Sequence, residues 1–322
     1  MRRRPKVLIQ PIHEAGARLL AGSGCDVRLA LDPSPAALAR DLEGCQGFLV
    51  RTAPVPASLI EAAASLQVIA RHGVGTDNVD VAAATRRKIP VCITPRANAL
   101  SVAEHVIALM LALAKQVVAY DAAVRKGEWS IRDGFRSVDL AGRTLGIIGM
   151  GRIGTLVCRK AKAAFDMEVL AYDPFIAPQR MEEAGAKVVE TVPELLRSSD
   201  FVTLHVPSSP RTKGLIGDEE IAAMKPSAFV INTGRGSLVD EVALVRALQE
   251  RRIAGAGLDV FGREPPEANH PLFGLPNVVL TPHSAGLTLE SAVRMATDAA
   301  QAIIDVLEGR RPEGVVNPEV FA

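Results

Sequence analysis

The chain has 322 residues, which is too long for one typical domain and comfortable for two. Its composition, 48% hydrophobic and 23% charged, is ordinary for a soluble α/β protein. The formal net charge of +1 provides no general field that would attract nucleic acid or an anionic membrane, so we expect neither as a partner.

Cysteine usage and the N-terminal segment bear on the compartment. The chain has four widely spaced cysteines, Cys25, Cys45, Cys92 and Cys158. Because they form no CxxC or Cys/His pattern, we expect buried thiols in a reducing compartment and no metal site. The apolar run at residues 7–9 is too short for a signal-peptide core, and the most apolar helix candidate, residues 106–114, is too short to span a bilayer. We therefore expect a cytoplasmic protein.

The N-terminal part of the chain alternates short β-branched runs with Ala- and Leu-rich stretches. The predicted strands cover residues 6–10, 26–29, 47–50, 67–71 and 90–93. Residues 15–20 and 34–42 are predicted helices between them. This alternation predicts a parallel sheet with helices on both faces.

A long helix is predicted in the middle of the chain. The string SVAE at residues 101–104 is a capping-box pattern, in which the serine caps the helix and the glutamate reaches back. The helix should run from about residue 101 to 126 and end at Gly127. Because it is hydrophobic over most of its surface, we expect it to be buried between domains or subunits.

A second alternation of strands and helices begins at Thr144. The predicted strands cover residues 145–148, 168–172, 201–204, 228–232, 255–258 and 278–281. Predicted helices include residues 152–164 and 241–250, and a last helix covers about 289–307. The pattern predicts a second doubly wound sheet.

The first predicted strand of this part leads into a glycine-rich turn, LGIIGMGRIG at residues 145–154. Gly149 would permit the tight turn, Gly151 would let the backbone approach a pyrophosphate, and Gly154 would let helix and strand pack closely. Asp173 follows 19 residues after Gly154, where a ribose-binding carboxylate belongs. An acid there favours NAD over NADP, although Asp173 could also be a simple turn residue before Pro174.

Three further segments follow predicted strands and have unusual composition. Arg235 stands between Gly234 and Gly236, two acids stand at Asp259 and Glu264, and His283 lies in the string PHSAG at residues 282–286. The carboxyl ends of parallel strands share one edge of the sheet, so we expect these side chains to gather there. An arginine can clamp a carboxylate and polarise a keto group, and a histidine oriented by a carboxylate can transfer a proton. The set suits a 2-hydroxy or 2-keto acid.

With this glycine-rich turn and these three segments, the chain resembles the D-isomer-specific 2-hydroxyacid dehydrogenase family. The resemblance rests on NTGRGSLVD at residues 232–240, on Asp259, Glu264 and the PHSAG string, and on RHGVGTDNVD at residues 71–80, NALSVAEH at 98–105 and VNPE at 316–319. It runs from about Val7 to Pro318 and is nearest to phosphoglycerate dehydrogenases without a regulatory domain. It implies a discontinuous, flavodoxin-like substrate domain (residues 1–98 and 287–322), an inserted Rossmann NAD-binding domain (residues 99–286) and a homodimer that uses the long helix.

The resemblance also implies residue roles. Arg235 would bind and polarise the substrate, His283 would donate and accept the proton, and Glu264 would support His283. Asp259 would hold the nicotinamide carboxamide, and the backbone of Gly73, Val74 and Gly75 would receive the substrate carboxylate. Further expected NAD contacts are Arg152, Ile153, His205, Val206, Thr233, Gly234, Ser284, Ala285 and Gly286.

Six histidines compete for the proton-transfer role. His13 and His270 stand in turn-like surroundings and are expected at the surface. His105 is expected to be a hydrogen-bonded structural residue, and His205 to lie beside the cofactor. His72, on a glycine-rich loop, could face the substrate. We assign the role to His283, because it alone follows a late strand with the PHSAG pattern.

The substrate itself stays open between several acids. Arg51, Arg71 and Arg132 occupy segments that supply cations to the phosphorylated substrate in phosphoglycerate dehydrogenases, so 3-phosphoglycerate or a similar dianionic acid is preferred. Surface solvation is the alternative for each arginine, above all for Arg132. Hydroxypyruvate, glyoxylate and sulfolactate remain alternatives. Glu264 argues against a formate-oxidising relative, which carries glutamine there, and a corepressor-type NAD(H)-sensing protein is the alternative from another class.

Overall fold

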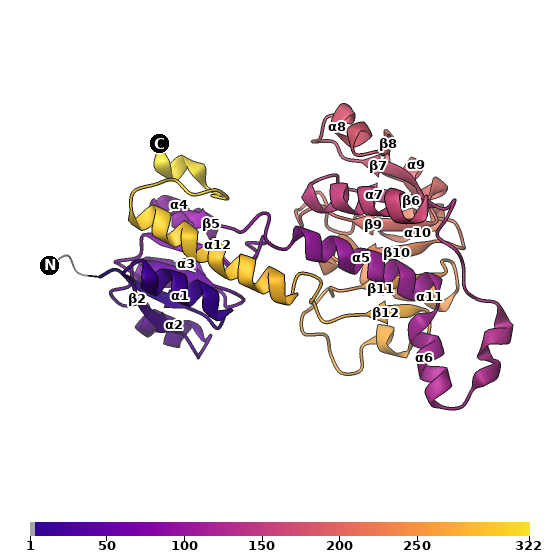
Figure 1. Ribbon diagram of the computed structural model, residues 1–322, viewed down its shortest axis with the longest axis horizontal. Helices are drawn as coiled ribbons and strands as arrows, with labels where there is room; N and C mark the ends of the chain where they lie inside the picture. Colours follow the sequence, from indigo (N-terminus) through magenta and orange to yellow (C-terminus); the bar gives the residue numbers. More distant parts are fainter. Residues whose placement is uncertain (1–3) are drawn as a thin grey trace. The chain divides into compact units, whose positions relative to one another are not determined.

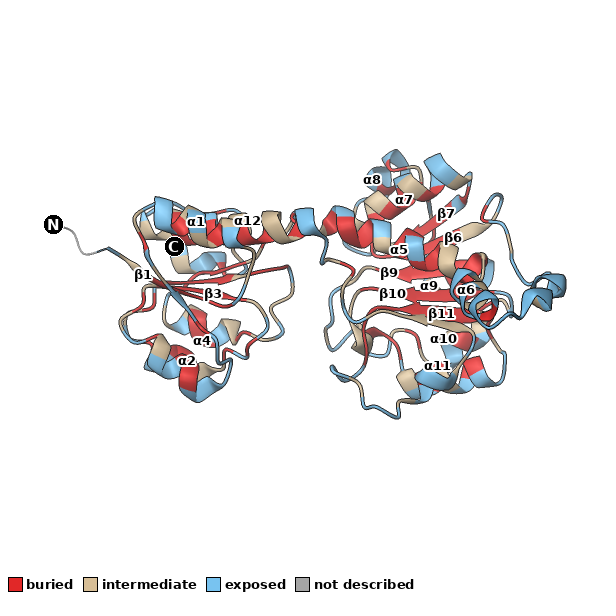
Figure 2. Cartoon of the chain, turned by 60° about the horizontal axis from the view of Figure 1, so that its bottom comes forward, coloured by how far each residue is buried: buried red, intermediate tan, exposed pale blue. Residues whose placement is uncertain are grey.

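The structure, a computed structural model, describes residues 4–322, which form two compact units (Figure 1). Among the described residues, the discontinuous unit comprises residues 4–98 and Leu287–Ala322, and the inserted unit comprises Ala99–Gly286. Each unit is built on a parallel sheet whose central strands are buried on both faces, as the red strands of Figure 2 show. Such strands read as continuous apolar runs in a sequence.

The discontinuous unit has a five-stranded sheet among its described residues. In spatial order the strands are β2 (Asp26–Leu29), β1 (Lys6–Ile9), β3 (Gly47–Val50), β4 (Val68–Arg71) and β5 (Val91–Cys92). One face shares its core with α2 (Pro35–Asp41), α3 (Ala57–Ala62) and α4 (Val81–Arg86), and the other with α1 (Glu14–Gly22) and α12 (Leu289–Leu307). This is the strand order of flavodoxin-like sheets, which confirms the predicted doubly wound architecture.

The inserted unit has a seven-stranded sheet among its described residues. In spatial order the strands are β12 (Val278–Leu280), β11 (Gly255–Leu258), β10 (Phe229–Asn232), β9 (Phe201–Leu204), β6 (Thr144–Ile148), β7 (Glu168–Tyr172) and β8 (Lys187–Val188). The sheet order reverses between β6 and β9, and ligands of doubly wound sheets bind outside the carboxyl ends of the strands at such a point. The predicted Rossmann architecture is confirmed.

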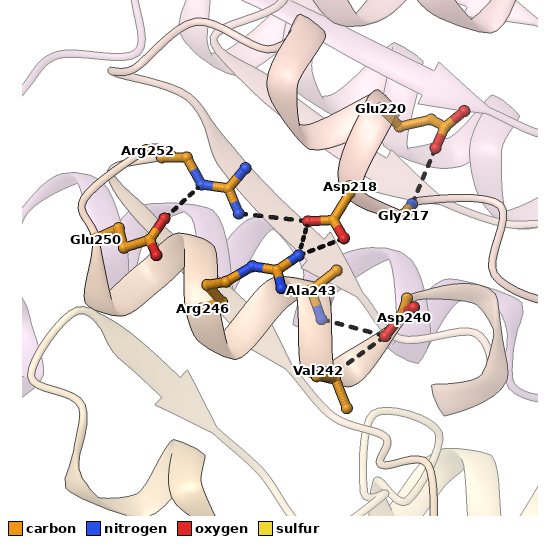
Figure 3. A network of polar contacts seen from close by, with 9 residues as sticks. All are labelled: Gly217, Asp218, Glu220, Asp240, Val242, Ala243, Arg246, Glu250 and Arg252. Carbon is orange, nitrogen blue, oxygen red and sulfur yellow. Dashed lines mark hydrogen bonds and ion pairs between the residues drawn. The ribbon is translucent and has the colours of Figure 1, made fainter.

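Helices cover both faces of the inserted sheet. The first face shares its core with α5 (Ala99–Ala114), α7 (Arg152–Phe165) and α8 (Pro178–Glu183). The second shares its core with α9 (Val192–Ser198), α10 (Asp218–Ala223) and α11 (Glu241–Gln249). An exposed ion-pair network joins α10 to α11, in which Arg246 pairs with Asp218, and Arg252 lies 3.4 Å from the same carboxylate and 3.1 Å from that of Glu250 (Figure 3).

The prediction of one long helix over residues 101–126 is wrong. The segment is broken into α5 and α6 (Val117–Arg125), which are bent by 57°. Gln116 takes a left-handed φ of 54°, and the carbonyl of Ala114 accepts a hydrogen bond from the N–H of Val138 at 2.8 Å. The returning chain therefore satisfies a carbonyl at the end of α5, and the helix need not continue.

The predicted capping box is wrong as well. Ser101 lies inside α5, which begins at Ala99, and Glu104 pairs with Lys160 at 3.1 Å instead of reaching back to the helix start. The apolar surface of α5 is buried inside the inserted unit against α7, β10 and β11. Within residues 4–322 no single helix is long and apolar enough to cross a membrane, and only the bent pair of α5 and α6 meets that length and composition.

An arm projects from the sheet of the inserted unit. It consists of α6 and the 3₁₀ turn η1 (Trp129–Gly134), and α6 extends away from the strands in Figure 1. Its exposed apolar side chains are Val117, Val118, Val124, Trp129 and Phe135. The arm thus presents apolar surface that the inserted unit does not bury.

Candidate functional site

The glycine loop joins β6 to α7, and each of its glycines meets a different steric demand. A Cβ at Gly149, where φ is +99°, would lie 2.7 Å from the backbone of His205. A Cβ at Gly154 would lie 2.1 Å from the carbonyl oxygen of Gly149. At Gly151 a Cβ would meet no described atom within 4 Å. The first and last glycines are therefore required by packing, whereas Gly151 leaves its backbone open to a ligand.

The first turn of α7 is available to an anion. Gly151 is its N-cap residue, and no side chain among residues 4–322 caps the helix there. A helix of 14 residues offers free N–H groups and the positive end of its dipole at this point. Arg152 is exposed and Ile153 half-buried at the same turn. These features fit the pyrophosphate of a dinucleotide.

Asp173 follows β7 and is bound to two backbone groups. Its Oδ2 accepts a hydrogen bond from the N–H of Met150 at 2.8 Å, and its Oδ1 accepts one from Phe175 at 2.9 Å. Each carboxylate oxygen can accept a second bond, so ribose hydroxyls still have acceptors. The aspartate both fixes the glycine loop and fits a sugar beside it.

His205 and Val206 follow β9 and lie against the glycine loop. The N–H of His205 donates to the carbonyl of Ile148 at 2.8 Å, and its ring Nε2 lies 3.0 Å from the hydroxyl of Thr203. Burial lowers the pKa of His205 to about 3. Its ring is therefore neutral near pH 7 and is engaged by its own strand.

Arg235 lies on a turn that the side chain of Asn232 holds. This buried amide accepts a hydrogen bond from the N–H of Gly234 at 3.0 Å and donates one to the carbonyl of Arg235 at 2.8 Å. The guanidinium of Arg235 in turn donates to the carbonyl of Gly234 at 2.8 Å. Thr233 is buried beside this turn. This role of Asn232 was not predicted, although an amide at a strand end is a signal for such a turn.

His283 and Glu264 form a pair at the same edge of the sheet. The Nδ1 of His283 is 2.6 Å from Oε2 of Glu264, and Oε1 of Glu264 accepts a hydrogen bond from the N–H of Phe261 at 3.1 Å. Burial alone would raise the pKa of Glu264, but its hydrogen bonds from His283 and Phe261 and the nearby charge of Arg235 lower it below the ordinary value. Glu264 is therefore a carboxylate near pH 7, and the three predicted residues lie together.

Asp259 holds the loop that carries His283. Its fully buried carboxylate accepts hydrogen bonds from the hydroxyl of Thr281 at 2.5 Å and from the N–H groups of Ser284 and Ala285 at 2.9 and 2.8 Å. His105 of α5 lies 3.0 Å from the same hydroxyl, which is the structural contact expected of it. The backbone of His283 takes a left-handed φ of 52°, and its N–H donates to the carbonyl of Asp259 at 2.8 Å.

A cavity of about 450 Å³ adjoins this pair within the inserted unit. Its lining is mostly apolar and consists of Phe261, Glu264, Pro265, Pro266, Phe273, Leu280, Thr281, Pro282 and His283. The two polar partners of the pair thus open onto a space large enough for a small organic acid.

The glycine-rich loop after β4 lies in the discontinuous unit. The guanidinium of Arg71 donates to Oδ1 of Asn78 at 3.2 Å and to the carbonyl of His72. Gly73 has a φ of +136°, Val74 is 41% exposed and Gly75 is half-buried. This loop therefore presents backbone, while its arginine already has partners.

Three residues expected near the substrate or at the surface differ in environment. Arg51 is half-buried after β3, and no hydrogen bond or ion pair within the described residues occupies its guanidinium. His72 is buried, and burial together with Arg51 and Arg71 lowers its pKa to about 4. Arg132 is exposed on η1, over the ring of Trp129 at 5.6 Å and 3.5 Å from Asp133.

The expectation that His270 lies at the surface is wrong. Its side chain is 13% exposed and binds Glu241 at 2.9 Å. His13 is half-buried and accepts a hydrogen bond from Ala15 at the start of α1. No group of three metal-binding side chains is found among residues 4–322, and all four cysteines are buried free thiols.

The model of the family described as "D-isomer specific 2-hydroxyacid dehydrogenase, NAD binding domain" matches residues 107–285. A glyoxylate reductase of Korarchaeum cryptofilum is 42% identical over 294 residues, which cover 89% of this chain and 87% of that protein. The chain belongs to the D-isomer specific 2-hydroxyacid dehydrogenase family. Its inserted unit therefore contains the family's NAD-binding domain, in agreement with the open glycine loop.

Other relatives and solved structures are also similar to this chain over most of its length. A D-3-phosphoglycerate dehydrogenase of Methanocaldococcus jannaschii is 42% identical over 97% of this chain, which spans 59% of that protein's length. A Thermus thermophilus protein of known structure is 38% identical, with a TM-score of 0.87 and coverage of 97% of this chain and 99% of that one. A Sinorhizobium meliloti glyoxylate/hydroxypyruvate reductase, solved with NADP and malonate, is 31% identical, with a TM-score of 0.82 and coverage of 95% and 93%.

Proposed function

We propose that this chain is an NAD-dependent 2-hydroxyacid dehydrogenase, which interconverts a D-2-hydroxy acid and its 2-keto acid. The observation that carries the proposal is the 2.6 Å contact between His283 and Glu264 at the sheet edge that also holds Arg235 and the glycine loop. A protein that only senses NAD(H) needs the glycine loop but has no need of an acid–base pair beside it. The pair therefore favours an enzyme over a binding protein of corepressor type.

His283 transfers the proton in this proposal. Its Nδ1 is taken by Glu264, so Nε2 is the nitrogen that faces the substrate oxygen. Glu264 is ionised near pH 7 and stabilises the imidazolium while it keeps the ring in one orientation. General acid–base catalysis of this kind contributes about 10²–10⁴-fold in rate.

Arg235 binds the carboxylate of the substrate and polarises its keto oxygen, because a guanidinium presents paired donors that match both groups. We also propose that backbone N–H groups of Val74 and Gly75, in the loop after β4, bind the substrate. When bound, NAD(H) accepts or supplies the hydride. The proposed NAD contacts are Gly149, Gly151, Arg152, Ile153, Gly154, Asp173, His205, Val206, Thr233, Gly234, Asp259, Ser284, Ala285 and Gly286.

The proposed role of Asp259 is shared between the cofactor and the protein. Its carboxylate already accepts three hydrogen bonds from the His283 loop. A carboxylate has about four acceptor positions, so one remains for a carboxamide N–H. We infer that Asp259 aligns the nicotinamide and the His283 loop together.

We propose 3-phosphoglycerate or a similar dianionic acid as the substrate, with hydroxypyruvate or glyoxylate as the alternative. Relatives named for both kinds of activity are about equally similar to this chain. Arg51 supports a dianionic substrate, because no hydrogen bond or ion pair within residues 4–322 occupies its guanidinium, whereas Arg71 is already bound to Asn78. Charged hydrogen bonds contribute about 1.5–3 kcal/mol each, which is about tenfold or more in kcat/KM.

A comparison of 3-phosphoglycerate, glycerate, sulfolactate and lactate at fixed NAD tests this choice. We expect the dianionic acids to exceed lactate at least about tenfold in kcat/KM, and Arg51→Gln to remove most of that preference. An equal kcat/KM for lactate would refute the proposal of a dianionic substrate. If the protein turns over none of these acids and neither hydroxypyruvate nor glyoxylate, the proposed dehydrogenase function is refuted.

We also propose a homodimer that works in the cytoplasm. The exposed apolar side chains of the arm support self-association, because a second copy would remove them from water. Four free buried thiols support a reducing compartment. Light scattering of the purified protein measures the first point directly, and a monomeric mass would refute it.

A further inference from the structure

A second imidazole–carboxylate pair, His270 and Glu241, contacts the segment of residues 261–266, which we call the Glu264 loop. The Nε2 of His270 is 2.9 Å from Oε1 of Glu241. The side chains are 13% and 31% exposed, whereas the Arg246 and Asp218 side chains in Figure 3 are each about half exposed. The partly buried pair is therefore screened less by solvent than that surface network.

Glu241 connects this pair to the loop. It is the first residue of α11, and its Oε2 accepts a hydrogen bond from the backbone N–H of Gly262 at 3.1 Å. One carboxylate oxygen thus binds His270 and the other binds the loop. Hydrogen bonds to an ionised acceptor are about twice as strong as neutral ones, so Glu241 holds the loop two residues before Glu264.

The contacts of His270 define which nitrogen donates. Its Nδ1 accepts a hydrogen bond from the N–H of Leu272 at 3.4 Å, and a ring nitrogen that accepts carries no proton. Nε2 is therefore the donor to Glu241. The ring also packs against Phe261 and Phe273, with centroids 5.7 and 5.5 Å apart, so His270 supports the loop by packing as well.

The other side of the loop is closed by the arginine turn. A Cβ at Gly236 would lie 1.9 Å from the carbonyl oxygen of Phe261, which leaves no room for the loop to move toward Arg235. The N–H of Phe261 donates to Glu264, and Glu264 binds His283. A displacement of Phe261 would therefore change the geometry of the acid–base pair.

We propose that Glu241 and His270 are positioning residues for the acid–base pair, which hold the loop so that Glu264 meets His283 in the orientation that proton transfer needs. The inference rests on the proposed dehydrogenase function. A displacement of about 1 Å caused away from the reacting atoms can lower a rate about 100-fold. The glycine loop and Asp173 do not touch this pair, so NADH binding should be preserved.

Three variants separate positioning from general stabilisation. His270→Phe keeps the packing on Phe261 but removes the donor to Glu241, and His270→Gln restores a donor. Arg246→Ala is the matched control, because Arg246 shares α11 with Glu241 but pairs with Asp218 of α10 (Figure 3). The measurements are kcat and KM for the keto acid and for NADH, together with the melting temperature.

We expect His270→Phe to lower kcat about tenfold and to leave the KM for NADH within about twofold. His270→Gln should recover most of the loss, and Arg246→Ala should keep the wild-type kcat. In a Glu264→Gln background His270→Phe should add little, because residues that act through one another are not additive.

Wild-type kcat in His270→Phe would overturn the positioning role while leaving the dehydrogenase function intact. So would an undiminished tenfold loss in the Glu264→Gln background. If the wild-type protein reduces no 2-keto acid, the proposed function fails and this inference fails with it.

Discussion

Two loops at the carboxyl edge of the inserted sheet are held by different means. The glycine loop after β6 is fixed mainly by backbone packing, since a Cβ at Gly149 or Gly154 would collide with main-chain atoms, and the carboxylate of Asp173 adds one hydrogen bond to Met150. The loop at residues 281–286 is fixed by side chains, above all by the buried carboxylate of Asp259 and its hydrogen bonds to Thr281 and Ser284.

The difference follows from what each loop has to present. A pyrophosphate is bound by backbone N–H groups, so the glycine loop has to present its main chain in a tight turn rather than one particular side chain. Proton transfer needs one imidazole in one orientation, and that orientation depends on partners from other parts of the chain, such as His105 and Glu264. Substitutions in the two loops should therefore fail in different ways.

Removal of the proposed proton donor should cause the largest loss of activity and should leave the glycine loop intact. His283→Ala should lower kcat at least about 100-fold, because no other described group pairs with Glu264 in its place. NADH binding, measured by fluorescence titration, should stay within about twofold. A variant with wild-type turnover would show that His283 is not the acid–base residue.

Two substitutions within the glycine loop should separate shape from ligand contact. Gly154→Ala forces a Cβ onto the carbonyl of Gly149 and should cost about 1–3 kcal/mol in overpacking, so both the melting temperature and NADH affinity should fall. Gly151→Ala meets no described atom within 4 Å, and it should weaken NADH binding while the melting temperature stays unchanged. Equal melting temperatures for the two variants would contradict the packing argument.

Asp173 tests the proposed ribose contact beside the glycine loop. The wild-type protein should prefer NAD to NADP in kcat/KM, because a carboxylate repels a 2′-phosphate. Asp173→Ala should narrow that preference about tenfold. Glu168→Ala, an exposed acid at the other end of β7, is the control and should leave the preference unchanged. A wild-type preference for NADPH would refute the role of Asp173.

His72 provides a buried counterpart to the half-exposed His283. Its folded-state pKa of about 4 lies below the ordinary 6.5, so the unfolded chain takes up a proton that the folded chain refuses. Stability should fall as the pH drops from about 6.5 toward 4, by up to about 1.4 kcal/mol per pH unit. In His72→Phe the free energy of unfolding, measured by urea denaturation, should differ less between pH 7 and pH 5 than it does in the wild-type protein. An unchanged slope would mean that His72 is protonated in the folded protein.

Much of the architecture could be read from the sequence, because it depends on local patterns. Strands buried on both faces are continuous apolar runs, and β3, β7, β9 and β11 match their predicted bounds. The largely exposed edge strand β2 also matches its predicted bounds. The glycine loop and the residues Arg235, Glu264 and His283 were recognisable because each follows such a strand. The two-residue strand β8 was not predicted, since so few residues carry too little periodicity. The six- or seven-residue helices α3, α4, α8, α9 and α10 lie where the alternation predicts helices, but no bounds were predicted for them.

Contacts between residues that are far apart in the sequence could not be predicted, and only the tertiary structure shows them. The break between α5 and α6 depends on Val138 reaching the carbonyl of Ala114, which no periodicity in the helix announces. The partners of Asp259 and the burial of His270 against Glu241 are set by loops that meet only in the folded chain. An apolar pattern acts over a few residues and is written in the sequence, whereas a hydrogen bond between distant side chains exists only once the sheet has brought its strand ends together.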